Sequence, residues 1–477
     1  MDHLLWGIAY GVAVLLAVTA AGHALLTKRD PRSALGWITA SLLAPFAGAI
    51  LYWSMGINRI PRRARQWQQM GRRLTGWQIF PSQGEEATAQ LLPRGAGHLT
   101  DLRDLGDRVV GVPLLEGNTV LPLHNGEGAY PPMLAAIDGA TSSVHLSTYI
   151  FDMDKIGQRF TDALKRAAAR GVAVRVLVDG LGEKYSLPTV SSRLKGSGVR
   201  VERFLPLRQG AYLNLRDHRK ILIVDGVTSF TGGMNIGDRH VVGAMAGDFP
   251  VVDLHFRMEG PAVADLQRVF LDDWHFATGE LLDDETLFPP QLTDGTALVR
   301  VVADGPELET RKLEWVIMGA LSSARDRVQI MTPYFIPDRP LLAALNIAAL
   351  RGVKVTLVLP EVNNLPFVSW ASRAYLWELL QAGIRVFFQP PPFAHTKLFI
   401  ADGIWSLIGS ANLDPRSLRL NFELNQEVYD RQFARTLERH FETVVASSRE
   451  IFLADMDGRS LPVKLRDSFA KLFSPYL

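Results

Sequence analysis

The longest apolar stretches of the chain lie at its start. Residues 4–26 contain no Asp, Glu, Lys or Arg and a single histidine, His23, and residues 34–57 contain no acidic or basic side chain. Each stretch is long enough to cross the ~30 Å hydrocarbon core of a bilayer as one helix. With the polar turn 28–32 between them, they predict a transmembrane helical hairpin over residues 1–60, kinked at Pro45. A cleaved signal peptide fits less well because a second apolar stretch follows, and the other interpretation is two buried helices of a soluble domain.

Beyond residue 116 the pattern changes to short apolar runs that alternate with amphipathic segments. Residues 144–151 and 172–179 have the apolar character of buried strands, and residues 157–169 between them form a predicted helix that ends at Gly171. Strand, helix and strand in this order predict a parallel α/β unit.

The same order recurs in the second half of the chain. Residues 328–335 match residues 144–151, and Gly383-Ile-Arg-Val matches Gly198-Val-Arg-Val at an offset of 185 residues. One large duplication explains this better than an array of short repeats. The predicted organisation is the hairpin (1–60), a basic membrane-proximal segment and linker (61–115), a first half (116–295) and a second half (296–477).

Charge is unevenly distributed. The net charge is +2, yet residues 1–73 hold nine Lys or Arg against Asp2 and Asp30. These bases flank the apolar stretches, where anionic lipid headgroups would be, and a broad basic face for nucleic acid is not indicated. Six of them are arginines that follow the second predicted span (59, 62, 63, 65, 72, 73), so the positive-inside rule places the large domain in the cytoplasm. The chain has no cysteine, which excludes disulfides and thiolate chemistry.

The candidate chemistry lies in a motif that occurs twice. His218-Arg-Lys220 with Asp225 reads H-x-K-x4-D, and so does His395-Thr-Lys397 with Asp402. Each copy leads into a glycine turn, and the asparagine of that turn, Asn235 or Asn412, lies 17 residues after its histidine. A single H-x-K beside a strand is weak evidence, but two copies with matched spacing indicate one site built from both halves.

These residue types suit a phosphate. One neutral histidine can attack phosphorus while a second, protonated histidine gives its proton to the leaving oxygen. Lysines and neutral donors can hold the charge that develops on the other oxygens. The scheme needs no metal and no cofactor.

The sequence resembles the phospholipase D superfamily, whose signature is this doubled motif, and within it the bacterial cardiolipin synthases. The run Gly409-Ser-Ala-Asn-Leu-Asp-Pro-Arg-Ser417 with Asn421-Phe-Glu423 is close to a pattern of that family. The resemblance covers essentially the whole chain. It implies two phospholipase D-like α/β/α sandwich halves related by pseudo-twofold symmetry, behind the membrane hairpin.

The resemblance also implies roles for individual residues. It implies a covalent phosphatidyl-histidine, with His218 favoured as nucleophile and His395 as acid and base, although the near-symmetric sequence does not decide between them. Lys220, Lys397, Asn235, Asn412 and Ser410 would bind the phosphate. Glu423 would orient His395, and Asp253 would orient His218. The match at Asp253 is weaker, because Val251-Val252 precede it where the family often has a tryptophan two residues earlier. Asp225 and Asp402 fit a structural role better than a proton-carrying one.

The implied reaction joins two phosphatidylglycerols into cardiolipin and releases glycerol at the inner membrane. The alternatives are a phospholipase D that uses water or small alcohols, phosphatidylethanolamine as co-substrate, a lipid-binding protein without turnover, and a nuclease. Two motifs let one chain build the site, so catalysis does not require a dimer and the oligomeric state stays open.

The last stretch, residues 463–477, predicts an amphipathic helix. Leu465, Phe469, Leu472 and Phe473 share one face, with lysines elsewhere. Docking of this face against the domain is the first expectation, and binding to a membrane surface is the second.

Overall fold

The computed structural model describes residues 2–28, 31–56, 92–205, 215–243, 249–305 and 311–474. The chain divides into two compact units, residues 1–64 and 65–477. The predicted basic arginines at 59–73 and most of the predicted linker lie outside the described residues.

The N-terminal unit begins with α1 (Asp2–Thr27), whose residues 5–27 form the one helix in the described chain with the length and apolarity of a membrane span. The second predicted span is broken at Pro45 into α2 (Pro31–Leu43), α3 (Ala47–Leu51) and a π-helical turn, η1 (Tyr52–Gly56). α2 is ~20 Å long at 1.5 Å per residue, too short to cross a bilayer alone. A two-span hairpin is therefore not confirmed.

Contacts within this unit show that the second segment folds back on itself. The Tyr52 hydroxyl lies 2.6 Å from Nδ1 of His23, and Lys28 donates to the carbonyl of Gly56. Tyr52 also meets the ring of Trp37 at a centroid distance of 5.5 Å. Gly48 packs so tightly against Ala40 that a Cβ at position 48 would lie 2.0 Å from its carbonyl oxygen. The second segment therefore ends, at Gly56, beside the C-terminal end of α1, where Lys28 begins the turn.

The large unit is built on one sheet of 15 strands. The first half contributes them in the order β4-β3-β2-β5-β6-β8-β1, and the second half repeats this order as β12-β11-β10-β14-β15-β16-β9, with β17 added at its edge. The first set is β1 (Leu115–His124), β2 (Ser143–Thr148), β3 (Ala173–Asp179), β4 (Arg200–Phe204), β5 (Ile221–Val224), β6 (Thr228–Gly232) and β8 (Leu254–Glu259). The second is β9 (Ala297–Asp304), β10 (Arg327–Met331), β11 (Lys354–Pro360), β12 (Arg385–Gln389), β14 (Leu398–Ala401), β15 (Trp405–Gly409), β16 (Glu423–Tyr429) and β17 (Arg449–Ile451).

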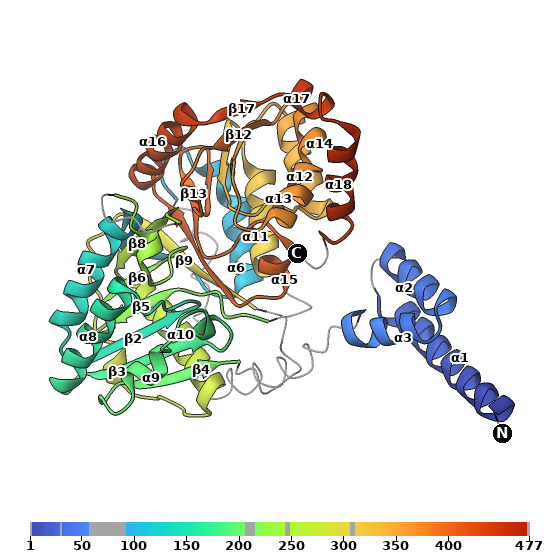
Figure 1. Cartoon of the computed structure of the whole chain (residues 1–477). Helices are drawn as coiled ribbons and strands as arrows, with labels where there is room; N and C mark the ends of the chain where they lie inside the picture. Colours follow the sequence, from blue (N-terminus) through green and yellow to red (C-terminus); the bar gives the residue numbers. More distant parts are fainter. Residues whose placement is uncertain are drawn as a thin grey trace. The chain divides into compact units, whose positions relative to one another are not determined.

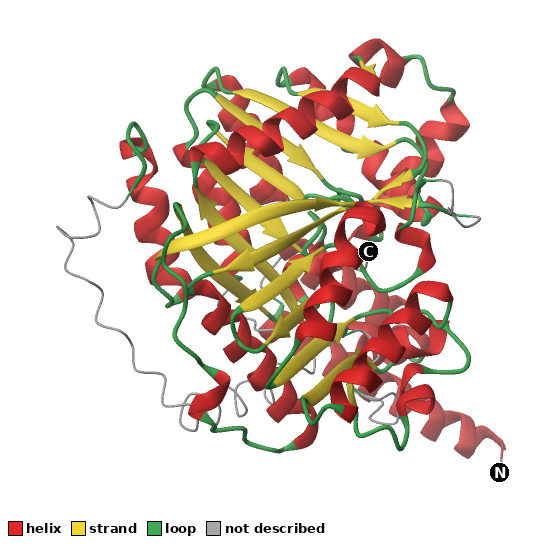
Figure 2. Ribbon diagram, turned by 90° about the vertical axis from the view of Figure 1, so that its left-hand side faces the viewer, coloured by secondary structure: helices red, strands yellow, loops and turns green. Residues whose placement is uncertain are grey.

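The two halves join where β1 pairs with β9 in antiparallel fashion. An antiparallel pair of equivalent strands at the centre is what a pseudo-twofold relation between duplicated halves requires. Within each half, three strands run parallel (β2-β3-β4 and β10-β11-β12), as predicted from the strand–helix–strand order. Figure 2 shows helices on both sides of the sheet.

Helices cover the sheet and fill the junction (Figure 1). The first half has α7 (Asn125–Gly139), α8 (Lys155–Ala169), η3 (Gly182–Tyr185), α9 (Val190–Leu194), η5 (Asp238–His240), α10 (Ala262–Thr278) and η6 (Glu285–Leu287). The second has α11 (Lys312–Ser323), α12 (Arg339–Leu350), α13 (Pro366–Arg373), α14 (Leu376–Gln381), α15 (Pro415–Arg419), α16 (Arg431–Ser447), α17 (Leu453–Asp457) and α18 (Leu461–Lys471). α10 and α16 share one buried core with strands of both halves, so the halves are fused rather than merely adjacent.

The end of the predicted linker is part of the domain. Residues 97–110 form η2 (Gly97–Leu99) and α6 (Thr100–Val110), and α6 packs on α11 of the second half (Figure 1). Leu99, Leu102 and Val110 belong to the second-half core, and Asp107 pairs with the buried Arg300. The prediction of a linker up to residue 115 missed this helix because its short amphipathic pattern follows a Pro- and Gly-containing stretch.

The C-terminal helix docks, but not through its apolar face. α18 packs on α13, and its buried residues are Asp467 and Ala470. Leu465, Phe469 and Leu472 of the predicted apolar face are exposed. Arg459 and Arg466 both pair with the buried Asp467 within the same segment, and the Arg466 guanidinium carbon lies 4.7 Å from the ring centroid of Trp370 in α13.

Candidate active site

The two motif segments meet at the junction of the halves. His218 and Lys220 immediately precede β5, and His395 and Lys397 immediately precede β14. All four side chains are largely buried. The side chains of His218 and His395 are 12% and 11% exposed. The doubled motif thus builds one site, as the sequence predicts.

Each histidine is paired with a carboxylate from the opposite half. Nδ1 of His218 donates to Glu423 at 3.0 Å, and Nδ1 of His395 donates to Asp253 at 2.7 Å. The predicted pairing, Glu423 with His395 and Asp253 with His218, was therefore wrong, although both carboxylates were correctly expected at the histidines.

Backbone hydrogen bonds explain the exchange. The N–H of His218 donates to the carbonyl of Phe422, and the N–H of His395 donates to that of Val252. Phe422 directly precedes Glu423, and Val252 directly precedes Asp253. A short parallel pairing of β7 (Val251–Val252) with β13 (Phe393–Ala394) makes the same connection. These backbone hydrogen bonds join each motif to the carboxylate-bearing segment of the other half.

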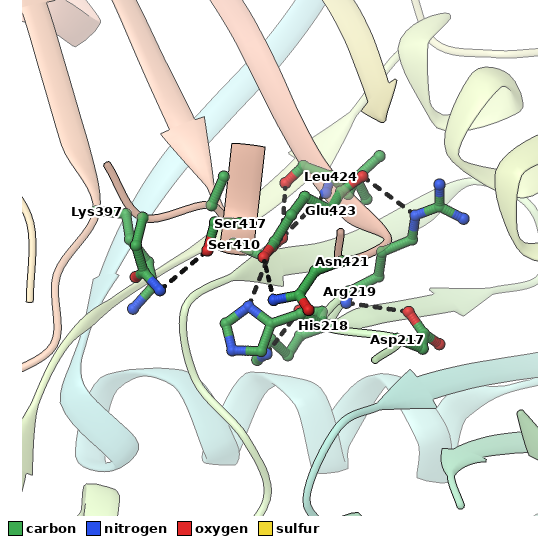
Figure 3. Close-up of polar contacts among 12 residues, drawn as sticks. Asp217, His218, Arg219, Lys397, Ser410, Ser417, Asn421, Glu423 and Leu424 are labelled. Carbon is green, nitrogen blue, oxygen red and sulfur yellow. Dashed lines mark hydrogen bonds and ion pairs between the residues drawn. The ribbon is translucent and has the colours of Figure 1, made fainter. Parts of the chain in front are cut away.

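Glu423 is held by three donors (Figure 3). Besides His218, its carboxylate accepts from the Ser410 hydroxyl at 2.5 Å and from the Asn421 amide at 3.2 Å. Burial raises the pKa of Glu423, but His218, Lys220 and Ser410 outweigh that effect and lower it to about 2. Glu423 is therefore an anion that fixes the proton of His218 on Nδ1 and leaves Nε2 free.

Arg219, the variable residue of the first motif, supports this arrangement. Its Nε donates to the carbonyl of Glu423 at 3.2 Å, and its guanidinium pairs with Asp273 (Figure 3 shows Arg219 beside Glu423). The ring of Phe422 lies 5.4 Å from the guanidinium carbon. The second motif has Thr396 at this place, which makes the two sides unequal.

Asp253 has a different environment. The pKa of its buried carboxyl is raised by burial, and its Oδ1 accepts from the N–H of Leu254. A Cβ at Gly233 would lie 2.5 Å from Asp253 Oδ2. Gly233 occupies the place that Ser410 has in the second half, so the absence of a side chain there makes room for the Asp253 carboxylate.

The lysines lie against the histidines. Lys220 donates to the carbonyl of His218 at 2.6 Å, and Lys397 donates to that of His395 at 2.6 Å and approaches its Nε2 at 3.0 Å. Burial lowers the pKa of Lys220 to about 8 and that of Lys397 to about 7. Burial also lowers the pKa of His218, and that of His395 falls well below its usual value as Lys397 and His218 add to the effect. An anion bound between these groups would raise all four pKa values.

Asp225 and Asp402 lie away from the histidines, at the other ends of β5 and β14. Asp225 accepts from the N–H groups of Thr141, Ser142 and Ser143 at 2.8–2.9 Å. Asp402 accepts from the equivalent N–H groups of 325–327 and from His98 at 2.7 Å. Both have positive φ, near 52° and 54°, in the hairpin turn that follows. These contacts match the structural alternative and do not place either carboxylate at the reacting atoms.

The predicted phosphate ligands are only partly free to act as such. Asn235 uses its side-chain oxygen to accept from the N–H of Ile150, and Asn412 donates to Ser417 at 3.2 Å. Ser410 is not placed as a phosphate ligand, because its hydroxyl donates a hydrogen bond to Glu423 and accepts one from the N–H of Leu424. Its side chain lies where it stabilises the charge of Glu423 instead.

Several residues at the site were not predicted as site residues. The rings of Tyr149 and Tyr334 lie 5.5 Å and 6.5 Å from His218 and His395 respectively. His240 lies 6.5 Å from the His395 ring, and its Nε2 accepts from the N–H of Asn235. The signal was available for the tyrosines, since they match each other in the duplication. His240 and Ser417 likewise both lie 22 residues after their motif histidines.

Among the described residues, no group of three His, Asp or Glu side chains is arranged to hold a metal ion.

Comparison with known proteins identifies relatives along the whole chain. Residues 133–253 and 317–445 match the family described as "Cardiolipin synthase, PLD-like domain", and residues 15–56 match the family "Phospholipase D-nuclease N-terminal". Cardiolipin synthase A of Pseudomonas putida is 34% identical over 99% of this chain and 98% of its own length. Cardiolipin synthase 1 of Bacillus anthracis is 31% identical over 98% and 94%. The crystal structure of phosphatidylserine synthase from Haemophilus influenzae shares the fold, with a TM-score of 0.62 over 79% of this chain and all of that chain at 15% identity.

Proposed function

The chain belongs to the cardiolipin synthases with phospholipase D-like domains, and from this premise we propose that it joins two phosphatidylglycerols into cardiolipin at the two-histidine site. The observation that carries the proposal is the pair of buried histidine–carboxylate couples, each completed across the junction of the halves. Such couples allow one histidine to act as nucleophile and the other as acid.

In the first step, Nε2 of His218 attacks the phosphorus of one phosphatidylglycerol. A nitrogen–phosphorus bond forms, the bond from phosphorus to the headgroup oxygen breaks, and protonated His395 gives its proton to that oxygen. Glycerol leaves. Glu423 supports His218 in this role, because an anionic carboxylate on Nδ1 stabilises the positive charge that develops on the ring.

In the second step, neutral His395 takes the proton from a headgroup hydroxyl of the second phosphatidylglycerol. The freed oxygen attacks phosphorus, the nitrogen–phosphorus bond breaks and cardiolipin is formed. Lys220 and Lys397 stabilise the charge on the non-bridging oxygens in both steps. Burial lowers the pKa values of both lysines, and a bound phosphodiester supplies the negative charge that keeps both protonated.

We further propose that α1 crosses the inner membrane once and that residues 31–56 enter it and return. The contact of Lys28 with Gly56 supports this topology, because it brings the two ends of the returning segment together. All nine N-terminal bases then belong to one side of the membrane, which the positive-inside rule makes the cytoplasm. The catalytic unit follows these bases in the sequence and is cytoplasmic.

Product analysis tests the proposed reaction. Purified full-length protein in detergent–lipid micelles is given labelled phosphatidylglycerol as the only phospholipid, with and without a chelator. The expected products are cardiolipin and free glycerol in equal amounts under both conditions. Phosphatidic acid in place of cardiolipin would make the protein a hydrolase, and product that forms only after phosphatidylethanolamine is added would identify a second lipid substrate.

A further inference from the structure

Segments that follow β3 and β11 and the segment before β7 carry exposed apolar side chains near the residues that contact the motif histidines. We call them the apolar rim: Tyr185 and Leu187 from the first half, Val362 and Leu365 from the second, and Phe249 before β7. Their exposed fractions lie between 47% and 86%. We propose that the apolar rim docks on the surface of the lipid bilayer and holds the acyl-chain end of the substrate. This inference rests on the proposed function.

Ring contacts and a hydrogen bond connect the rim to the reacting histidines on both sides. In the first half, Tyr149 lies between His218 and Tyr185, with ring distances of 5.5 Å and 6.3 Å. In the second half, Tyr334 lies 6.5 Å from His395 and donates its hydroxyl to Asn364, the neighbour of Leu365. The rim therefore has the same duplicated arrangement as the catalytic residues, at the carboxyl ends of β3 and β11.

Phe249 is connected to His395 through its neighbour Pro250 and through Phe393. The carbonyl of Pro250 accepts from the N–H of Phe393, and the Phe393 ring lies 5.9 Å from His395. Phe249 precedes this anchored residue and is itself 86% exposed. Large apolar side chains left in water at one place indicate a surface that meets an apolar partner.

The burial of the histidines favours a lipid as that partner. Because each motif histidine side chain is about one-tenth exposed, the phosphodiester has to enter the site fully. The glycerol backbone and acyl chains of the same molecule then meet the side chains at the mouth. An apolar rim lowers the cost of lifting the lipid part of the way out of the bilayer.

The exposed face of α18 continues this surface. Leu365 precedes α13, Phe367 of α13 meets the ring of Phe473 at 5.6 Å, and Phe473 meets Phe469 at 5.3 Å. Leu465 and Leu472 are exposed on the same helix. α18 carries Lys464, Arg466 and Lys471 against one acid, Asp467. A positively charged helix with an exposed apolar face suits a surface of anionic lipids such as phosphatidylglycerol.

Single cysteines test the inference directly, because the chain has none of its own. Leu187→Cys, Leu365→Cys and Phe469→Cys are labelled with a polarity-sensitive fluorophore, and the full-length protein is reconstituted in phosphatidylglycerol vesicles. The matched control is Leu292→Cys. Leu292 is 61% exposed, within the range of the three test positions, but its neighbour Gln291 donates to Gly226, in the turn at the far end of β5 from His218.

Labels on the rim and on α18 should shift to an apolar spectrum and be quenched by quenchers carried on lipid chains, while the control label stays in water. Labels that stay aqueous would overturn the proposal. A shift that lipid-borne quenchers leave intact and that depends on protein density would also overturn it, and would assign the surface to a second copy of the chain.

A kinetic measurement separates this inference from the proposed function. Leu187→Ser with Leu365→Ser should lower the ratio of turnover on vesicle lipid to turnover on monomeric short-chain phosphatidylglycerol by about tenfold, since burying each leucine favours docking. An unchanged ratio contradicts the rim. If the unaltered protein makes no cardiolipin from either lipid, the proposed function fails, while the labelling result still decides where the bilayer binds.

Discussion

Glu423→Gln is the substitution that tests the crossed architecture most sharply. It keeps the shape of the side chain and removes the charge that accepts from His218, Ser410 and Asn421. The fall of the Glu423 pKa from an ordinary 4.5 to about 2 corresponds to ~3 kcal/mol in favour of the anion. If most of this interaction stabilises the charge that develops on His218, its loss slows the first step about 100-fold.

The assay follows the release of labelled glycerol in a single turnover, in which only the first step contributes. Glu423→Gln should lower the rate constant with little change in lipid affinity, because Glu423 is buried behind His218. Asp253→Asn is the matched comparison, since it removes the charge behind His395. In a His395→Ala background, Glu423→Gln should slow formation of the trapped adduct on His218 far more than Asp253→Asn does. A larger effect of Asp253→Asn, or a loss below about fivefold for Glu423→Gln, would refute the crossed assignment.

Four further outcomes are expected. In the free enzyme kcat/KM should fall as pH rises, because His395, whose pKa is lowered, loses its proton first and Lys397 and Lys220 lose theirs through about 7 to 8; a flat profile up to pH 9 would contradict the lowered pKa values. Gly233→Ser should displace the Asp253 carboxylate and reduce turnover about tenfold or more, whereas Gly139→Ser, which has open space around it, should not. Asp225→Asn should lower the free energy of unfolding by about 2 kcal/mol, seen in thermal denaturation in detergent, while folded protein keeps its activity. In intact spheroplasts an impermeant maleimide should label Asp2→Cys and should reach Lys28→Cys only after lysis, whereas a two-span hairpin with a cytoplasmic domain predicts the reverse.

The sequence predicts the duplicated α/β fold well because its signals are local and occur twice. The predicted strand over 172–179 is observed as Ala173–Asp179, and the predicted helix over 157–169 as Lys155–Ala169. The histidines and lysines of both motifs meet as predicted, since equal spacing in two halves places equivalent side chains at one junction. Asp225 and Asp402 show that a motif residue need not react. Each lies in a turn with positive φ, and its carboxylate accepts hydrogen bonds from three backbone N–H groups.

The crossed pairing of carboxylates could not be predicted from spacing. The family resemblance assigned Glu423 to His395 and Asp253 to His218, which keeps each pair within its own half, and the spacing of the residues gives no reason to cross them. The pairing is decided by backbone hydrogen bonds between segments about 140 to 200 residues apart, from His218 to Phe422 and from His395 to Val252.

Two expectations drawn from hydropathy differ in part from the structure: the second span is not confirmed, and α18 docks through a face other than its apolar one. Apolar length alone predicted a second span over 34–57, but the packing of Gly48 on Ala40 reverses the chain near Pro45. Helical periodicity alone predicted that the apolar face of α18 would be the docked one, but the face with Asp467 and Ala470 is buried, and Arg466 beside it packs on Trp370 of α13. In both cases a specific tertiary contact decides what hydropathy leaves open.

The measurement that tests the central claim most directly is mass-spectrometric location of the covalent lipid. The His395→Ala protein is mixed with phosphatidylglycerol, quenched in base to preserve a phosphorus–nitrogen bond, digested and sequenced. We predict a phosphatidyl group on His218, loss of that adduct in His218→Ala, and no cardiolipin from either variant. An adduct on another residue, or cardiolipin formed without His218, would contradict the two-histidine site completed across the junction of the halves.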